Sequence, residues 1–158
     1  MRQVIGVADM FVSDDPEDLL ITHALGSCIG IAIFDKVARV GGILHYMLPL
    51  SKADPQKAQS NPFMFGDTGI PALFQKAYSF GATKDNIRVV MAGGAEILSL
   101  GDSFDIGNRN ILIARKLFWK NQILISAEQV GGGISRTLSL DMASGQIWLT
   151  SSGIRTDL

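Results

Sequence analysis

The sequence predicts an α/β protein of the α+β kind, in which a mixed, largely antiparallel, β-sandwich-like sheet core is flanked by two to three helices. Three observations predict this fold. The 158 residues include 17 glycines but only 5 prolines, and glycine-rich turns separate many short apolar runs. Two segments carry the apolar spacing of amphipathic helices. The predicted order is four strands, a helix, a strand, a helix and three strands.

The individual elements follow from local patterns. Apolar segments predict the first four strands, at residues 4–7, 19–22, 29–34 and 40–46, and the polar stretch 51–62 is predicted to be a surface loop. A helix is predicted from Asp67, as its N-cap, to Gly81. The remaining elements are a strand at 87–92, a helix at 108–121, a strand at 123–130 and a hairpin of strands 134–140 and 146–150. No repeat or linker divides the chain, so residues 1–158 are expected to form one domain.

The composition excludes several classes of function. Fourteen basic and fifteen acidic residues give a net charge of −1 with no basic stripe, so nucleic-acid binding is not expected. The only cysteine cannot form an internal disulfide, which is typical of the cytoplasm. No secretory signal is evident, and the apolar run 29–34 is too short to span a bilayer. We therefore expect a cytoplasmic domain without direct membrane insertion.

The strongest chemical clue is that Cys28 and both histidines, His23 and His45, lie within one short stretch. A thiol nucleophile needs a nearby imidazole to take its proton and to protonate the leaving group. If Lys36 and Val37 form the tip of a hairpin, Cys28 faces His45 directly, with Cβ atoms roughly 4.5–5.5 Å apart. We expect a thiolate–imidazolium pair that lowers the pKa of the thiol.

Neighbouring residues supply the other parts of a catalytic site. The turn at Gly26 and Ser27 predicts outward-facing backbone N–H groups that stabilise an oxyanion. The Thr22 hydroxyl is expected to hold the second imidazole nitrogen, as a carboxylate does in a Ser-His-Asp triad. His23 is the rival base, but along an extended strand it points away from the face of Thr22, which favours His45.

Other interpretations of the same residues remain open. A lone cysteine in an apolar context is commonly a small buried hydrophobic residue. No Cys-x-x-Cys pair or His-Glu-x-x-His helix is present, so no metal is expected. The glycines at 93–94 and 131–133 match no phosphate-binding spacing, so no cofactor is expected either.

The same residues carry a family resemblance. Thr-x-x-Leu-Gly-Ser-Cys at 22–28, followed by His-x-Met-Leu-Pro at 45–49, resembles the bacterial chemoreceptor glutamine deamidase family CheD. The resemblance extends over almost the whole chain and includes the segments 4–7, 67–68, 92–95, 106–110 and 131–132. One departure is the segment 133–135, before Arg136, where the family is more polar.

The resemblance implies that Cys28, His45 and Thr22 are catalytic. It implies a protein-glutamine glutaminase that converts glutamines on the cytoplasmic helices of methyl-accepting chemotaxis receptors to glutamates and releases ammonia. The implied partner is the phosphatase CheC, and the implied fold is similar to the catalytic domain of the cytotoxic necrotising factors. Two alternatives stay open: a non-catalytic module that binds CheC or a receptor, and a receptor methyl-ester hydrolase that uses the same thiol.

Overall fold

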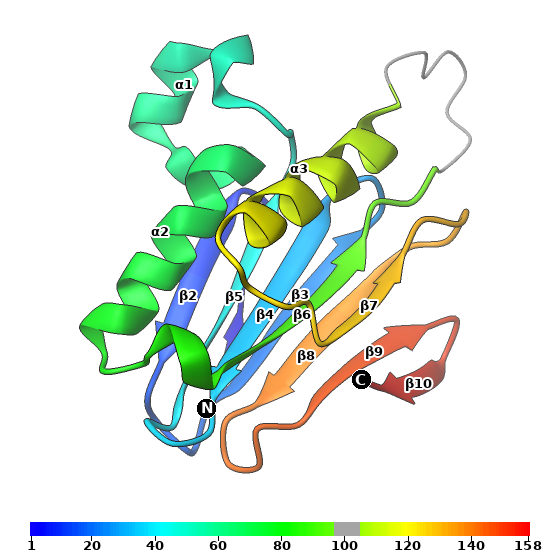
Figure 1. The fold of residues 1–158 in the computed structure, drawn as a ribbon. Coiled ribbons are helices and arrows are strands. Elements are labelled where there is room, and N and C mark those ends of the chain that lie inside the picture. The colour runs from blue at the N-terminus through cyan, green and yellow to red at the C-terminus, as the bar shows by residue number, and fades with distance from the viewer. Residues whose placement is uncertain (97–104) are drawn as a thin grey trace.

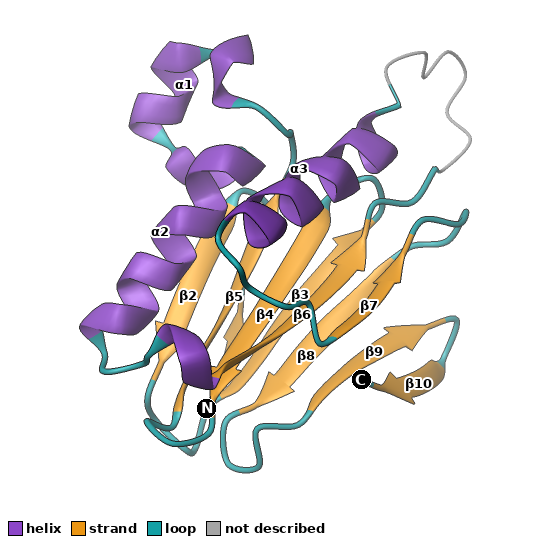
Figure 2. Cartoon of the chain, viewed as in Figure 1, coloured by secondary structure: helices purple, strands orange, loops and turns teal. Residues whose placement is uncertain are grey.

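The computed structural model describes residues 1–96 and 105–158 and has three layers (Figure 1). Two five-stranded sheets pack face to face, and the helices cover the outer face of one of them. Figure 2 shows the helices gathered on that single side. Two strand pairings are parallel, β1 with β3 and β6 with β7, and the other pairings among the described residues are antiparallel. The predicted fold class is confirmed.

The first sheet has the strand order β1-β3-β8-β9-β10. Its strands are β1 (Arg2–Val4), β3 (Leu19–Leu25), β8 (Arg136–Asp141), β9 (Ile147–Ser151) and β10 (Ile154–Asp157). The second sheet has the order β2-β5-β4-β6-β7. Its strands are β2 (Asp9–Ser13), β5 (Val40–Tyr46), β4 (Ile29–Asp35), β6 (Ile87–Gly93) and β7 (Ala127–Val130).

The α-helices are α1 (Pro55–Ser60), α2 (Gly66–Ser79) and α3 (Ile106–Lys120). Short 3₁₀ turns occur at Ser51–Ala53, Pro62–Met64 and Lys84–Asn86. The polar stretch 51–62, which we predicted to be a loop, is therefore partly helical. It contains a Pro at the first position of α1, where the missing N–H costs nothing, and the Asp54 side chain caps that helix.

The prediction that Asp67 caps α2 is wrong. The helix begins one residue earlier, after Phe65, which makes no side-chain cap bond. The Asp67 carboxylate instead accepts hydrogen bonds from the Ser51 N–H and the Ser51 hydroxyl, both at 2.9 Å. This carboxylate ties the segment that follows β5 to the start of α2.

Alternation along the strands of the second sheet produces two separate cores. In β4, Ile29, Ile31 and Ile33 face the helices, and they pack with side chains of α2 and α3. The alternate residues Ala32 and Phe34 face the first sheet and pack against leucines of β3 and β8. The functional question is which polar residues lie on this inner face.

Two strands escaped sequence analysis, and one was misplaced. β2 and β10 are short edge strands with few buried side chains, so they lack the alternation that identifies a half-buried strand. β1 lies at Arg2–Val4 instead of the predicted 4–7. Its parallel register with β3 nevertheless carries Ile5 alongside Ile21, since the Ile5 N–H donates to the Ile21 carbonyl at 2.8 Å.

Candidate active site

Cys28 lies where the chain crosses from the first sheet to the second. β3 ends at Leu25, β4 begins at Ile29, and Cys28 is half-buried in the turn between them. The Cys28 carbonyl accepts a hydrogen bond from the Gly94 N–H at 2.9 Å. A Cβ on Gly93 would lie 2.2 Å from that carbonyl oxygen, so only glycine allows this close approach. The turn is thus fixed by β6, and Cys28 within it is only partly buried.

His45 lies on the inner face of β5, but the predicted register of the hairpin is wrong by two residues. His45 pairs with Gly30, not with Cys28. The turn contains four residues, 36–39, because the Asp35 side chain accepts from the Val37 and Ala38 N–H groups and Arg39 adopts a left-handed φ of 59°. A shift of two preserves the face, since side chains alternate with period two. Cys28 is therefore a diagonal neighbour of His45 on that face.

Thr22 meets His45 across the gap between the two sheets, as predicted. The Thr22 Oγ1 lies 2.7 Å from His45 Nδ1 and 2.7 Å from the Ile5 carbonyl oxygen, and both side chains are fully buried. A carbonyl only accepts, so the single hydroxyl proton of Thr22 points to Ile5. The hydroxyl oxygen must then accept from Nδ1–H. This arrangement selects the tautomer in which Nε2 carries a free lone pair.

The protonation states differ from the predicted ion pair. Burial lowers the pKa of His45 from its ordinary 6.5 to about 4. Burial also raises the pKa of the Cys28 thiol, an effect that its own backbone N–H partly offsets. The thiol makes no hydrogen bond to His45 Nε2. Burial therefore favours the neutral form of both groups, which is opposite in direction to the expected lowering of the thiol pKa.

Asn110, in the first turns of α3, is a residue that sequence analysis missed. Its buried side chain donates from Nδ2 to the Ser27 carbonyl at 2.9 Å and to the Met47 carbonyl at 2.8 Å. One amide group thereby joins the turn before Cys28 to the strand end after His45. An asparagine in a helix is more commonly a surface residue, so only its three-dimensional contacts identify it.

The remaining candidate residues divide into two groups. Gly26 and Ser27 are half-buried beside Cys28, and the Ser27 and Cys28 N–H groups donate to no other residue in the described parts of the chain. His23 points outward, is exposed, and lies 3.4 Å from the Thr137 hydroxyl. His23 and Thr22 therefore point to opposite sides of β3, as the predicted alternation requires.

Unsatisfied polar atoms concentrate at this site. Within residues 1–96 and 105–158, the buried side-chain atoms without a hydrogen-bond partner are His45 Nε2 and Asn110 Oδ1. Buried polar groups are normally paired, so an unpaired one calls for an explanation. In those same residues, no group of three or more His, Cys, Asp or Glu side chains is arranged to hold a metal ion.

The fold and the site together define a class: an α+β sandwich with a half-buried thiol near an imidazole whose tautomer is set by a threonine. The comparisons with known proteins narrow this class. The chain belongs to the CheD family, because a family model described as "CheD chemotactic sensory transduction" matches residues 47–151. That match begins after His45, but full-length relatives cover the site as well.

Two such relatives are similar over almost their whole length. The probable chemoreceptor glutamine deamidase CheD 1 of Syntrophus aciditrophicus (strain SB) is 49% identical over 150 residues, which are 95% of this chain and 94% of that protein. The probable chemoreceptor glutamine deamidase CheD of Solibacter usitatus (strain Ellin6076) is 48% identical over 159 residues, covering 100% and 94%. Among solved structures, a Neisseria meningitidis protein (family model DUF152) is 11% identical with a TM-score of 0.42, over 82% of this chain and 62% of that one. No described helix is long and apolar enough to cross a membrane.

Proposed function

We propose that this chain is a cysteine-dependent amidohydrolase, a protein-glutamine glutaminase that converts selected glutamine side chains of methyl-accepting chemotaxis receptors to glutamates. Cys28 is the nucleophile, His45 is the general base and acid, and Thr22 orients the imidazole. The names of the relatives support the reaction and the substrate. The observation that carries the proposal is the Thr22–His45 contact of 2.7 Å, which directs the free Nε2 lone pair to the inner face that Cys28 shares.

The first half of the reaction forms a thioester. As the carboxamide enters, the Cys28 thiol proton passes to His45 Nε2, and Sγ attacks the carboxamide carbon. The resulting imidazolium donates this proton to the amide nitrogen. The C–N bond then breaks, ammonia leaves, and the glutamine side chain stays attached to sulfur as an acyl group.

The second half releases glutamate. His45 Nε2 takes a proton from water, and the hydroxide attacks the thioester carbon. The C–S bond breaks, and the proton returns to the sulfur, so the enzyme is regenerated. The charge on the oxygen in both tetrahedral intermediates is stabilised by the backbone N–H groups of Ser27 and Cys28, which donate to no other residue within 1–96 and 105–158.

A neutral resting pair is compatible with this chemistry. The thiol pKa is raised and the imidazole pKa is lowered by the same cause, burial. Proton transfer is therefore coupled to substrate entry, because a polar amide beside Nε2 favours the charged pair more than the buried apolar surroundings do. A thiol protected in this way does not react with small electrophiles as fast as a free thiolate.

We also propose the cytoplasm as the compartment and CheC as a protein partner. An enzyme whose only cysteine is its nucleophile needs a reducing environment to keep the thiol free. The CheC proposal follows from the family alone, in which this phosphatase competes with receptors for the active-site face.

Mass spectrometry of a receptor cytoplasmic fragment tests the function. Incubation with the wild-type chain should convert specific glutamines to glutamates, visible as the mass change of an amide-to-acid conversion. Cys28→Ala should reduce the rate on the order of 10⁴-fold or more, because removing the nucleophile removes the covalent route. Wild-type protein that produces no conversion, or an undiminished rate with Cys28→Ala, would refute the proposal.

One observation favours a second candidate, a non-catalytic module that binds a receptor or CheC. The thiol pKa is raised and the thiol lacks a bond to His45, as for an inert buried cysteine. Under this alternative Cys28→Ala would leave every measurable property of the complex unchanged. A methyl-ester hydrolase would instead release methanol from a methylated receptor fragment. Comparing the wild-type and Cys28→Ala chains on that fragment tests this possibility.

A further inference from the structure

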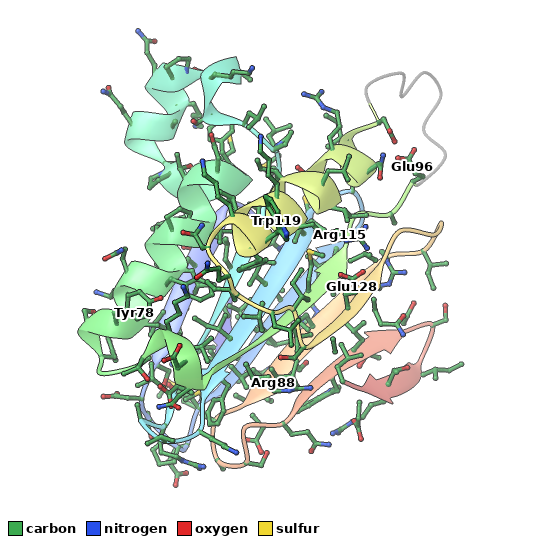
Figure 3. All side chains as sticks on the ribbon, viewed as in Figure 1. Tyr78, Arg88, Glu96, Arg115, Trp119 and Glu128 are labelled. Carbon is green, nitrogen blue, oxygen red and sulfur yellow. The ribbon has the colours of Figure 1, made fainter. Side chains whose placement is uncertain are left out.

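The outward side of α3 has an unusual charge pattern. The helix contains Arg109, Arg115, Lys116 and Lys120 and no acidic residue, although the whole chain has a net charge of −1. Arg115 forms an ion pair with Glu128 of β7, and Figure 3 shows these two side chains together. Lys116 and Lys120 form no ion pair within the parts of the chain that the structure describes. A positive charge excess is therefore left on one helix of a nearly neutral protein.

Apolar side chains alternate with these charges. Leu112 is 52% exposed and Trp119 is 82% exposed, and Figure 3 labels Trp119 on α3. Four exposed residues of α3 lie at intervals of three, four and three positions, so they form one stripe about 15 Å long on the helix surface. They are Arg109, Leu112, Lys116 and Trp119. This is the spacing at which the side chains of one helix meet a second helix lying alongside.

A groove runs beside this stripe. Its other wall is the segment 48–53, and two adjoining hollows of about 350 and 250 Å³ form its floor. We call this the α3 groove, and its lining residues are Leu48, Pro49, Leu50, Lys52, Ala53, Ile106, Arg109, Leu112, Ile113 and Lys116. The charged lining residues are Lys52, Arg109 and Lys116, all of them basic.

The α3 groove is linked to the candidate active site through Asn110, whose side chain also donates to the carbonyl of Met47, the residue before Leu48 of the groove. Arg109 lines both hollows and is next to Asn110, whose side chain donates to the Ser27 carbonyl. Pro49, on the opposite wall, lies four residues after His45 in the chain. The helix that lines the groove is therefore hydrogen-bonded directly to the turn that carries Cys28.

We propose that the α3 groove binds an acidic α-helical segment of the substrate receptor, and that this contact selects which glutamines reach Cys28. The helical form follows from the three-four spacing of the stripe, and the acidic character follows from its basic lining. Leu112 lines the groove, and the exposed Trp119 continues the stripe on α3 beyond the lining residues. Both supply apolar contact, and Trp is prominent among residues that dominate binding energy. This inference rests on the proposed function, because the occupant is the protein that carries the target glutamine.

Charge reversal measured by direct binding tests the proposal. The Cys28→Ala chain and an immobilised receptor cytoplasmic fragment give a Kd that does not depend on turnover. We expect Lys116→Glu and Trp119→Ala each to weaken binding by about tenfold, because like charges and lost aromatic contact both cost affinity at an interface. Both side chains are exposed, so neither change should lower the melting temperature.

Lys36→Glu is the matched control, since it makes the same charge change at an exposed turn of the β4–β5 hairpin. Its Kd should equal that of the parent. In the active enzyme, Lys116→Glu should raise KM and leave kcat unchanged, and the difference from Lys36→Glu should shrink at high salt. Equal Kd values for both variants would overturn the groove proposal while leaving the deamidase proposal intact.

Tryptophan fluorescence provides an independent measurement. Trp148→Phe leaves Trp119 as the only tryptophan, and its emission should shift to the blue when the receptor fragment covers it. No shift on a saturated complex would contradict the proposal. The proposal would also be contradicted if Lys116→Glu abolished self-association of the chain or its binding to anionic lipid vesicles. The groove would then serve a second copy of the chain or a membrane surface. A wild-type chain that binds but does not deamidate would refute the proposed function alone.

Discussion

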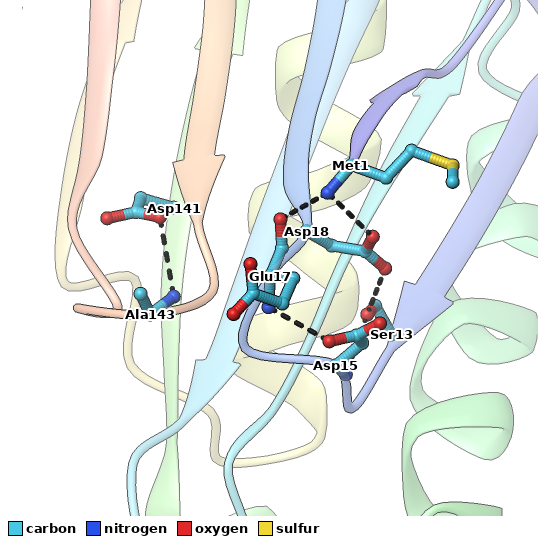
Figure 4. Close-up of polar contacts among 7 residues, drawn as sticks. All are labelled: Met1, Ser13, Asp15, Glu17, Asp18, Asp141 and Ala143. Atoms are coloured by element: carbon cyan, nitrogen blue, oxygen red, sulfur yellow. Dashed lines mark hydrogen bonds and ion pairs between the residues drawn. The ribbon is translucent and has the colours of Figure 1, made fainter.

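Buried polar groups are fully hydrogen-bonded at one end of β4 and incompletely hydrogen-bonded at the other. We call the end at Asp35 the far end and the end beside Cys28 the near end. At the far end, Asp35 is buried, and its carboxylate accepts backbone N–H bonds from Val37, Ala38 and Thr83, each at 2.9 Å. Burial alone would raise the pKa of Asp35, but these donors outweigh it and hold that pKa below its ordinary value. The neighbouring Asp18 accepts from the Ser13 hydroxyl at 2.7 Å and lies 3.6 Å from the Met1 ammonium (Figure 4).

At the near end, beside Cys28, the polar groups are left incomplete. Among the residues that the structure describes, His45 Nε2 and Asn110 Oδ1 are buried without partners, whereas each oxygen of Asp35 is bonded. A buried polar atom without a bond costs about 1–3 kcal/mol, so the near end is held in a less stable arrangement than the chain can build elsewhere. This contrast supports the proposal that the unpaired groups serve the reaction, because the far end shows how the same fold satisfies structural ones.

Removing the Thr22 hydroxyl should have the largest effect on this comparison. In Thr22→Val, the His45 Nδ1–H and the Ile5 carbonyl lose their shared partner, and the imidazole loses its fixed tautomer. We expect kcat to fall on the order of 10²-fold, since general base catalysis needs the correct nitrogen free. The free energy of unfolding should fall by about 2 kcal/mol. Receptor deamidation rates and urea unfolding measure the two effects.

Thr22→Ser separates orientation from packing, because it keeps the hydroxyl and loses only a methyl group. It should restore most of the rate. If Thr22→Val were as active as the wild type, the near end would be merely a structural polar cluster like that around Asp35.

Asn110→Ala should have an intermediate effect. It leaves the Ser27 and Met47 carbonyls without their donor, so the turn before Cys28 and the strand end after His45 are no longer joined. We expect about a tenfold loss of kcat, with little change in KM, because small displacements between reacting groups are costly. Asn110→Ser, which keeps one O–H donor, should lie between the wild type and Asn110→Ala.

Asp35→Asn is the control for lost stability, since it disturbs three N–H bonds at the far end. Both it and Asn110→Ala should lower the free energy of unfolding by about 2 kcal/mol. Only Asn110→Ala should change kcat. Equal kcat values for the two variants would mean that Asn110 acts through general stability instead of positioning.

Sequence reasoning predicted the parts of the near end that depend on alternation. Thr22 and His45 meet, and His23 points away, because successive residues of a strand face opposite sides of the sheet. Cys28 and His45 kept their shared face because the predicted register was wrong by an even number of residues. The signal for the longer turn was present in Asp35, whose side chain is suited to cap the N–H groups that follow it.

Properties that depend on distant neighbours could not be predicted. Asn110 acts by bridging two carbonyls that lie 83 and 63 residues away in the chain, which no local pattern encodes. The pKa values of Cys28 and His45 were misjudged because they depend on burial, and burial at the junction of two sheets follows from tertiary packing. Residue type indicated the chemistry, but only the fold determines the resting protonation state.

The smallest expected effect on the rate concerns pH, and it tests the protonation state directly. The folded-state pKa of His45 lies near 4, below its ordinary 6.5. Between these values the unfolded chain binds a proton that the folded chain does not, so the free energy of unfolding falls as the pH falls. The loss should approach about 3 kcal/mol at pH 4 and be absent above pH 6.5. His45→Gln should lack this component while keeping the acid-dependent contribution of Asp35.

In the wild type, kcat/KM should change less than about twofold between pH 7 and 5.5, with its acid limb near pH 4. An acid limb near pH 6.5 would mean that the imidazole is exposed to solvent, and the contrast between the two ends of β4 would then disappear.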